Sequence, residues 1–81
     1  MGTKNNPGRF DCMKAAEPDE PYFVLLGRDR DAAALVREWA MKRSAEGESG
    51  DKIMEALACA ADMEKFAMEY HSRPKAPVID G

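Results

Sequence analysis

The chain has 81 residues, of which 44% are hydrophobic and 33% charged, and its formal net charge is -3. This length holds one small domain, and the acidic balance argues against general nucleic-acid binding, which needs a basic surface to neutralise phosphates. No apolar run approaches the ~20 residues of a membrane span, so we expect no membrane association.

Residues 1–19 predict an extended N-terminal arm. The sequence Asn-Asn-Pro-Gly at 5–8 is typical of a turn. Further on, Pro18 and Pro21 each push the preceding residue out of the α region. We therefore expect the folded unit to begin near residue 20.

The two cysteines, Cys12 and Cys59, lie far apart in the sequence. A secreted disulfide scaffold normally carries more, and structural zinc needs four ligands, usually in close pairs. Residues 1–8 lack the hydrophobic core of a secretory signal. We therefore expect two reduced thiols in a cytoplasmic protein, with no metal and no cofactor.

The apolar segment "PYFVLL", residues 21–26, fits two structures. A proline at its start, with Asp19 as a cap, fits a short helix, whereas the aromatic and β-branched residues that follow favour a strand. A single strand would need a partner from another chain, because no other segment predicts one. We expect a short helix or turn at 20–27.

The segment 29–45 predicts the first long helix. Asp29 or Asp31 is expected to cap it by accepting hydrogen bonds from free backbone N–H groups. Glu38 and Lys42 form an i,i+4 pair in the favourable order. The apolar residues that recur at helical spacing are Leu35, Val36, Trp39 and Ala40.

After glycines at 47 and 50, the segment 51–72 predicts a second helix with Asp51 as its cap. Its apolar residues recur at spacings of three and four, opposite a charged face. That apolar face is too broad for one helical neighbour, so we expect one partner within the chain and one from another subunit. The expected oligomer interface comprises Ile53, Leu57, Ala60, Met63, Phe66, Ala67 and Tyr70.

Together these elements predict an all-α fold, an antiparallel helical hairpin over residues 20–71. The arm precedes it, and residues 72–81 form a flexible C-terminal tail. Alanines and methionines make up much of the core, and alanine buries little area. We therefore expect homo-oligomerisation to complete the fold.

The sequence offers little for catalysis. His71, the only histidine, has no nucleophile or carboxylate patterned beside it and is expected to be a helix C-terminal residue. No glycine-rich phosphate loop is present, and the carboxylates of the second helix follow a solvated face. We expect a protein without enzymatic activity or catalytic residues.

The best candidate for a binding site is the corner "GRDRD", residues 27–31. Arg28 and Arg30 flank a helix N-terminus, which attracts anions. In an acidic protein we favour the alternative that Arg28 pairs with nearby carboxylates, and Trp39 is first of all an expected core anchor. The ligand-binding candidates are Arg28, Arg30, Tyr22, Phe23, Trp39 and Arg43, with the aromatic rings as stacking surfaces for a base.

The stretch "NPGRFDCMKAAEPDEPYFVLLGRDRDAAALVREWA", followed by "EALACAADMEKF", resembles a group of small bacteriophage and prophage proteins of unknown function. The likeness covers residues 5–66 and includes the arm, the core Asp-Glu-Pro-x-Phe-x-Leu-Leu-x-Arg-Asp and a helix bearing Trp. Arg30 stands where these proteins often have Pro, and Phe66 where Trp is common. The resemblance implies a phage protein made in the bacterial host cytosol.

Two functions stay open at this point. The first is a non-enzymatic interaction protein that oligomerises and binds a host or phage protein. The second rests on an architectural likeness to the helical-hairpin sponges of phages. It is an anti-defence protein that sequesters a cyclic nucleotide signal at a subunit interface.

Overall fold

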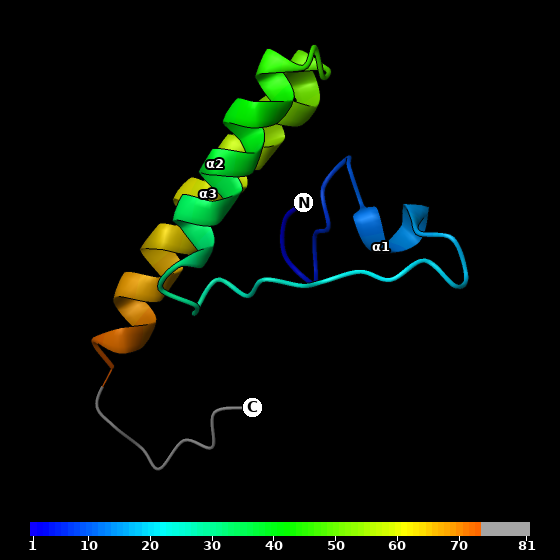
Figure 1. Cartoon of the computed structure of the whole chain (residues 1–81). Coiled ribbons are helices and arrows are strands. Elements are labelled where there is room, and N and C mark those ends of the chain that lie inside the picture. Colours follow the sequence, from blue (N-terminus) through cyan, green and yellow to red (C-terminus); the bar gives the residue numbers. More distant parts are fainter. Residues whose placement is uncertain (74–81) are drawn as a thin grey trace.

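The computed structural model describes residues 1–73, and this part of the chain contains three helices and no strand. They are α1 (Cys12–Ala15), α2 (Ala32–Ala45) and α3 (Gly50–His71). The all-α fold class is therefore confirmed. α2 and α3 lie side by side along their lengths, and the short connection 46–49 joins them, so they run in opposite directions (Figure 1). The greater part of the expected tail, residues 74–81, lies outside the described residues.

α2 starts at Ala32 and is not capped as expected. Asp31 holds the cap position, but its side chain makes no capping hydrogen bond. Instead, Asp29 Oδ1 accepts from the Asp31 N–H at 2.9 Å, and the Asp29 carbonyl accepts from the Ala32 N–H at 3.2 Å. Asp29 thus stabilises the turn before the helix, as aspartates commonly do. The expected pair of Glu38 and Lys42 is present at 3.5 Å.

α2 ends in a Schellman motif. Gly47 adopts a φ of 87°, a left-handed conformation that favours glycine. Its N–H donates to the Ser44 carbonyl at 3.1 Å, and the Glu48 N–H donates to the Arg43 carbonyl at 3.0 Å. These two bonds satisfy carbonyls that the helix end leaves free. They also fix the direction in which the chain returns to form α3.

α3 begins one residue earlier than expected, and Asp51 is not its cap. Ser49 holds the cap position without a side-chain hydrogen bond, and Asp51 lies in the first turn of the helix. A carboxylate in a first turn still interacts favourably with the helix dipole. Asp51 also pairs with the Arg9 guanidinium at 3.1 Å, so this end of the helix contacts the N-terminal arm.

The core between α2 and α3 is thin. The buried side chains are Ala32, Ala33, Ala40, Ile53, Ala56 and Ala60. Val36, Trp39 and Leu57 pack around their centre, together with Met1 from the arm. Small residues let two helices approach closely, but each buries little area. The single chain therefore has a modest hydrophobic stabilisation, with no large side chain fully buried among the described residues.

The first part of the N-terminal arm is docked rather than extended, which corrects the expectation for residues 1–10. Residues 1–10 fold back onto α3, and Met1 packs against the core. Residues Cys12–Ala15 form the single helical turn α1. Asp11 caps this turn, because its Oδ1 accepts from the N–H groups of Met13 and Lys14 at 3.2 and 3.3 Å.

The segment 20–26 forms neither a helix nor a strand, and the chain turns at 27–28. The short helix considered for this segment is thus absent, and the turn occupies only its end. Gly27 comes close to α3, where a Cβ atom on it would lie 3.5 Å from the Phe66 ring and 3.6 Å from the Met63 backbone. Near Gly27 the chain passes from the irregular segment to the helical pair, and Figure 1 shows this path of the backbone.

Candidate functional site

Arg28 and Arg30, the candidates for anion binding, form no ion pair with a carboxylate of residues 1–73. The pairing of Arg28 with neighbouring carboxylates, which we favoured, is therefore absent from this part of the chain. The Arg28 guanidinium lies instead over the Tyr70 ring, 5.9 Å from its centroid. The Arg28 carbonyl accepts a hydrogen bond from His71 Nε2 at 2.7 Å, so Nε2 carries a proton. These two contacts attach the 27–28 turn to the end of α3.

A cluster of cationic and aromatic side chains surrounds that end of α3. The Arg73 guanidinium lies 5.2 Å from the Tyr70 ring centroid and 5.7 Å from that of Phe66. The rings of Phe66 and Tyr70 stack at 5.9 Å. Arg28 and Arg73 therefore share the Tyr70 ring, and contacts of this kind contribute about 0.5–1 kcal/mol at exposed sites. The signal for this cluster was the i,i+4 spacing of Phe66 and Tyr70, with Arg73 just beyond the helix end, and our sequence interpretation did not use it.

Trp39 and Arg43 belong to a second, separate cluster. The Arg43 guanidinium lies 5.9 Å from the Trp39 ring centroid, and Lys52 Nζ of α3 lies 6.0 Å from it. Trp39 also packs against the core, as expected for an anchor between helices. It lies roughly two turns along α2 from the first residue of that helix. This cluster is therefore on the part of the helical pair nearer the 46–49 connection, away from Arg28.

Tyr22 and Phe23 are 65% and 86% exposed. Neither takes part in a cation–aromatic contact or an aromatic pair within residues 1–73. The six residues considered for one ligand site are thus divided among three places: the end of α3 for the two arginines 28 and 30, the second cluster for Trp39 and Arg43, and the exposed segment for Tyr22 and Phe23. The isolated chain does not assemble them into a single pocket.

The groove nearest Arg30 is shallow and open. It lies between α2 and α3 and includes Arg30, Arg37, Glu64 and His71 in its lining. Arg37 and Glu64 form an ion pair of 2.5 Å there, so their charges neutralise each other. Ligand sites usually enclose most of the surface of a small molecule, which this groove does not do.

Within residues 1–73, no three His, Cys, Asp or Glu side chains gather in a way that would hold a metal ion. The same residues contain no helix that is long and apolar enough to cross a membrane. Both cysteines are free thiols, Cys12 exposed and Cys59 half-buried. Burial raises the pKa of the Cys59 thiol, and the charges of Asp62 and Glu55 act in the same direction. Cys59 is therefore a packing thiol rather than a reactive thiolate.

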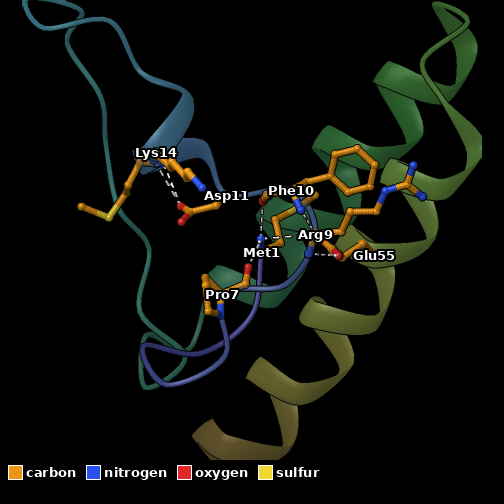
Figure 2. A network of polar contacts seen from close by, with 8 residues as sticks. Met1, Pro7, Arg9, Phe10, Asp11, Lys14 and Glu55 are labelled. Carbon is orange, nitrogen blue, oxygen red and sulfur yellow. Dashed lines mark hydrogen bonds and ion pairs between the residues drawn. The ribbon is translucent and has the colours of Figure 1, made fainter.

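A network of polar contacts joins the N-terminal segment to Glu55 of α3, as Figure 2 shows. The two carboxylate oxygens accept from the backbone N–H groups of Arg9 at 2.8 Å and of Phe10 at 2.9 Å. The Met1 ammonium lies 3.3 Å from Oε2 and also donates to the carbonyls of Pro7 and Phe10. We call this arrangement the Glu55 clamp. Sequence interpretation placed Glu55 on a solvated face and missed it.

In the clamp, the donors of residues 1–10 form an anion-binding site, and the Glu55 carboxylate of the same chain is the anion that occupies it. The Glu55 side chain is only 21% exposed. Desolvation would raise the pKa of Glu55, but the hydrogen bonds from Phe10 and Arg9 and the charge of the Met1 ammonium outweigh it and lower that pKa. The ionised carboxylate is thus the form that holds residues 1–10 on α3.

Two residues of the expected oligomer interface are covered by the chain itself. Ile53 is 8% exposed and Ala60 is fully buried. Together with Ala56 they form the stripe of α3 that faces α2, so they are not available to a second chain. Leu57, Met63, Ala67 and Tyr70 are half-buried, and Phe66 is 45% exposed.

The exposed apolar surface differs from the one expected. The large apolar side chains that remain in water within the described residues are Met13, Tyr22, Phe23, Val24, Leu26, Leu35, Met41, Met54, Phe66 and Met68. Four of these ten lie within the five residues 22–26. The densest exposed apolar surface is therefore the irregular segment and not a helix face.

Comparisons of this chain with protein-family models, with curated proteins and with solved structures find no match. The likeness to small phage proteins stays a prediction that rests on the residues quoted for it.

Proposed function

We propose that this chain is a non-enzymatic phage-type protein that associates with itself and binds a host or phage protein in the bacterial cytosol. The observation that supports this proposal most is the large surface that the folded chain leaves in water. Exposed apolar patches larger than a few hundred Å² commonly mark interaction sites.

The size of that surface is unusual for a monomer. Folded monomers of about 9 kDa expose roughly 4,900 Å², whereas this chain of 9.0 kDa exposes 6847 Å². Residues 74–81 account for at most about 1,100 Å² of this total, the area of a fully unfolded chain of that length. An excess of about 850 Å² remains, which is close to the ~800 Å² that each partner contributes to an ordinary stable interface.

The chemistry of the described residues supports a binding role over catalysis. The histidine ring bonds to the Arg28 carbonyl through Nε2, and the pKa of the Cys59 thiol is raised. Within residues 1–73 the His71 ring thus has no hydrogen bond to a nucleophile or a carboxylate, and the raised pKa disfavours the Cys59 thiolate, so the two groups form no nucleophile–base pair. Surface apolar residues without such a pair are typical of recognition surfaces.

Light scattering over a series of concentrations tests the self-association. We expect a mass of two or more chains, and a monomer at every concentration would contradict the proposal. Capture from host lysate tests the partner, with the full chain and the variant of the exposed Arg30, Arg30→Ala, compared side by side. A protein retained by the first and lost by the second supports the proposal.

The alternative function is anti-defence sequestration of a cyclic nucleotide. The observation that favours it is the pair of guanidinium groups, Arg28 and Arg73, over one Tyr70 ring. Two such cations beside an aromatic ring suit a phosphate and a base. A thermal-shift screen with cyclic di- and trinucleotides tests this, because a ligand at 100 times its Kd stabilises by ~2.7 kcal/mol. Arg28→Ala should abolish the shift, and a screen without any shift would rule this function out.

A further inference from the structure

We propose that residues 22–26 of two copies of the chain pair as antiparallel β-strands, with Val24 of each copy at a two-fold axis. The proposal rests on the self-association proposed above and names the segment that carries it. The single chain contains no strand among residues 1–73, so this pairing would create the only β-structure of the described region.

The backbone of this segment is unpaired. No hydrogen bond within residues 1–73 involves an N–H or C=O group of residues 21–25. The neighbouring bonds end on either side of it, where Glu20 donates to the Glu17 carbonyl and Asp29 donates to the Leu26 carbonyl. A free row of donors and acceptors is a template for pairing with another strand.

The side chains of the segment favour a strand that is covered on both faces. Tyr22, Val24 and Leu26 alternate with Phe23 and Leu25 along an extended chain. Both sets are apolar, and four of the five side chains are at least 51% exposed in the single chain. Aromatic and β-branched residues have high strand propensity. A second copy would remove this apolar surface from water.

The sequence is self-complementary in one register. With Val24 opposite its own copy, Tyr22 lies opposite Leu26 and Phe23 opposite Leu25, so every pair is apolar. Beyond the ends of the ribbon, Glu20 of each copy approaches Arg28 of the other, an attractive pair. If Phe23 lay on the two-fold axis instead, Glu20 would be opposite Leu26. If Leu25 lay there, Arg28 would be opposite Tyr22. Both registers place a charged residue opposite an apolar one.

Pro21 fits the same register. When the Val24 pair exchanges backbone hydrogen bonds, the pairs of Tyr22 and Leu26 do so as well, because bonded and non-bonded pairs alternate in antiparallel strands. Pro21 then falls at a non-bonded position, where its missing N–H costs no hydrogen bond. The proline thus begins the strand without interrupting it.

The occupant of this surface is a second copy rather than an unrelated partner for two reasons. The self-pairing joins like segments with matched apolar residues and opposite charges at both ends, which is the property of a two-fold interface. After an allowance for residues 74–81, the chain also exposes about 850 Å² more than a monomer of its mass, close to the area that each copy buries in a dimer of ordinary size.

Disulfide trapping tests the register, in full-length protein with Cys12→Ser and Cys59→Ala. Phe23→Cys and Leu25→Cys are made separately, and one variant carries a tag so that mixed dimers are distinct on a gel. The predicted partners form a non-bonded pair with Cα atoms ~4.5 Å apart, within disulfide range. Residue 23 of one copy and residue 23 of the other are diagonal neighbours with Cα atoms ~7–8 Å apart, which is too far for a disulfide, and the same holds for the two residues 25. Under a mild oxidant the mixture should form the mixed dimer roughly tenfold faster than either variant alone forms its own. Met41→Cys, exposed on α2, gives the background rate.

Val24→Pro supplies a second measurement. The Val24 N–H makes no hydrogen bond in the single chain, so we expect unchanged helicity and a light-scattering mass of one chain. Mixed disulfides at the background rate, or a Val24→Pro variant that keeps the parent mass, would overturn the strand pairing. If the parent is then still a dimer, self-association stands and only the segment is wrong. If the parent is a monomer, both proposals fall.

Discussion

Two irregular segments of the chain behave differently, although both contain proline and neither is a regular element. Residues 1–10 are docked on α3, because Glu55 accepts the N–H groups of Arg9 and Phe10. Residues 21–25 have no backbone hydrogen bond within the described chain and expose the side chains of Tyr22, Phe23 and Val24. The hydrogen bonds to the Glu55 carboxylate therefore distinguish residues 1–10, which pack on α3, from residues 21–25, which have no such acceptor.

Removal of the carboxylate should have the largest effect on this difference. In Glu55→Ala, the N–H groups of Arg9 and Phe10 and the Met1 ammonium lose their acceptor. We expect Tm to fall by roughly 4 °C or more, and the amides of residues 9 and 10 to exchange as fast as those of 22–25. The control is Glu64→Ala, which removes an exposed ion pair with Arg37. Equal losses of Tm in the two variants would show that the clamp adds nothing.

Gly8→Ala should also release residues 1–10 from α3, because it changes the backbone conformation that this packing requires. Gly8 has a φ of 78°, and a Cβ atom there would lie 2.2 Å from the Met1 carbonyl oxygen. We expect residues 1–10 to leave α3, with faster amide exchange at Phe10 and a lower Tm. Gly50→Ala is the matched control, since a Cβ at Gly50 meets nothing within 4 Å. Unchanged exchange at Phe10 in Gly8→Ala would contradict the role assigned to this turn.

A fall in pH should undo the docking without any substitution. The pKa of Glu55 is lowered in the folded chain, so the clamp stabilises fully above the ordinary carboxyl range and loses this contribution as pH falls through the lowered pKa. Glu55→Gln has no charge to lose at this position. We expect the Tm difference between wild type and Glu55→Gln to shrink from about pH 7 to about pH 3. A difference that stays constant over this range would exclude the ionised carboxylate as the cause.

The two long helices could be predicted from the sequence, whereas the role of Glu55 could not. The periodicity of the apolar residues predicts α2 and α3 and the core role of Trp39, because those patterns depend on neighbours within one helix. Glu55 is one of several carboxylates on the polar side of the second helix, and no spacing separates it from the others. Its role depends on residues 9 and 10 arriving at that point in space, which sequence patterns do not report.

The candidate binding residues show the same limit. Arg28 stands beside two aspartates in sequence, so an ion pair is the natural expectation. Among the described residues it lies over Tyr70 instead, because the turn at 27–28 carries it to the far end of α3. Trp39 and Arg28 look like one cluster along the chain, but the helix between them places them in separate clusters. Closeness in sequence thus predicted the helices well, but it did not predict which of the candidate residues lie together in the folded chain.

Substitution in the undocked segment should leave the single chain intact. Phe23 is 86% exposed, so Phe23→Ser removes little packing from the isolated chain, and we expect unchanged helicity in dilute solution. Self-association should weaken, because a large exposed aromatic side chain is the kind that anchors interfaces. Light scattering over a concentration series checks this, with Met13→Ser, another exposed apolar side chain, as the control. An equal loss in both variants would assign the effect to general surface hydrophobicity.

Arg9→Ala should have the smallest effect and separates the two kinds of contact that residue 9 makes. Its guanidinium pairs with Asp51 at 3.1 Å, and both side chains are more than 70% exposed, at 72% and 74%. Exposed pairs of this kind contribute about 0–1 kcal/mol and weaken with salt. The backbone N–H of residue 9 can still donate to Glu55 in the variant, so residues 1–10 should stay docked with nearly wild-type amide exchange. Release of the segment in Arg9→Ala would mean that the side-chain pair, and not the backbone bonds to Glu55, holds the arm on α3.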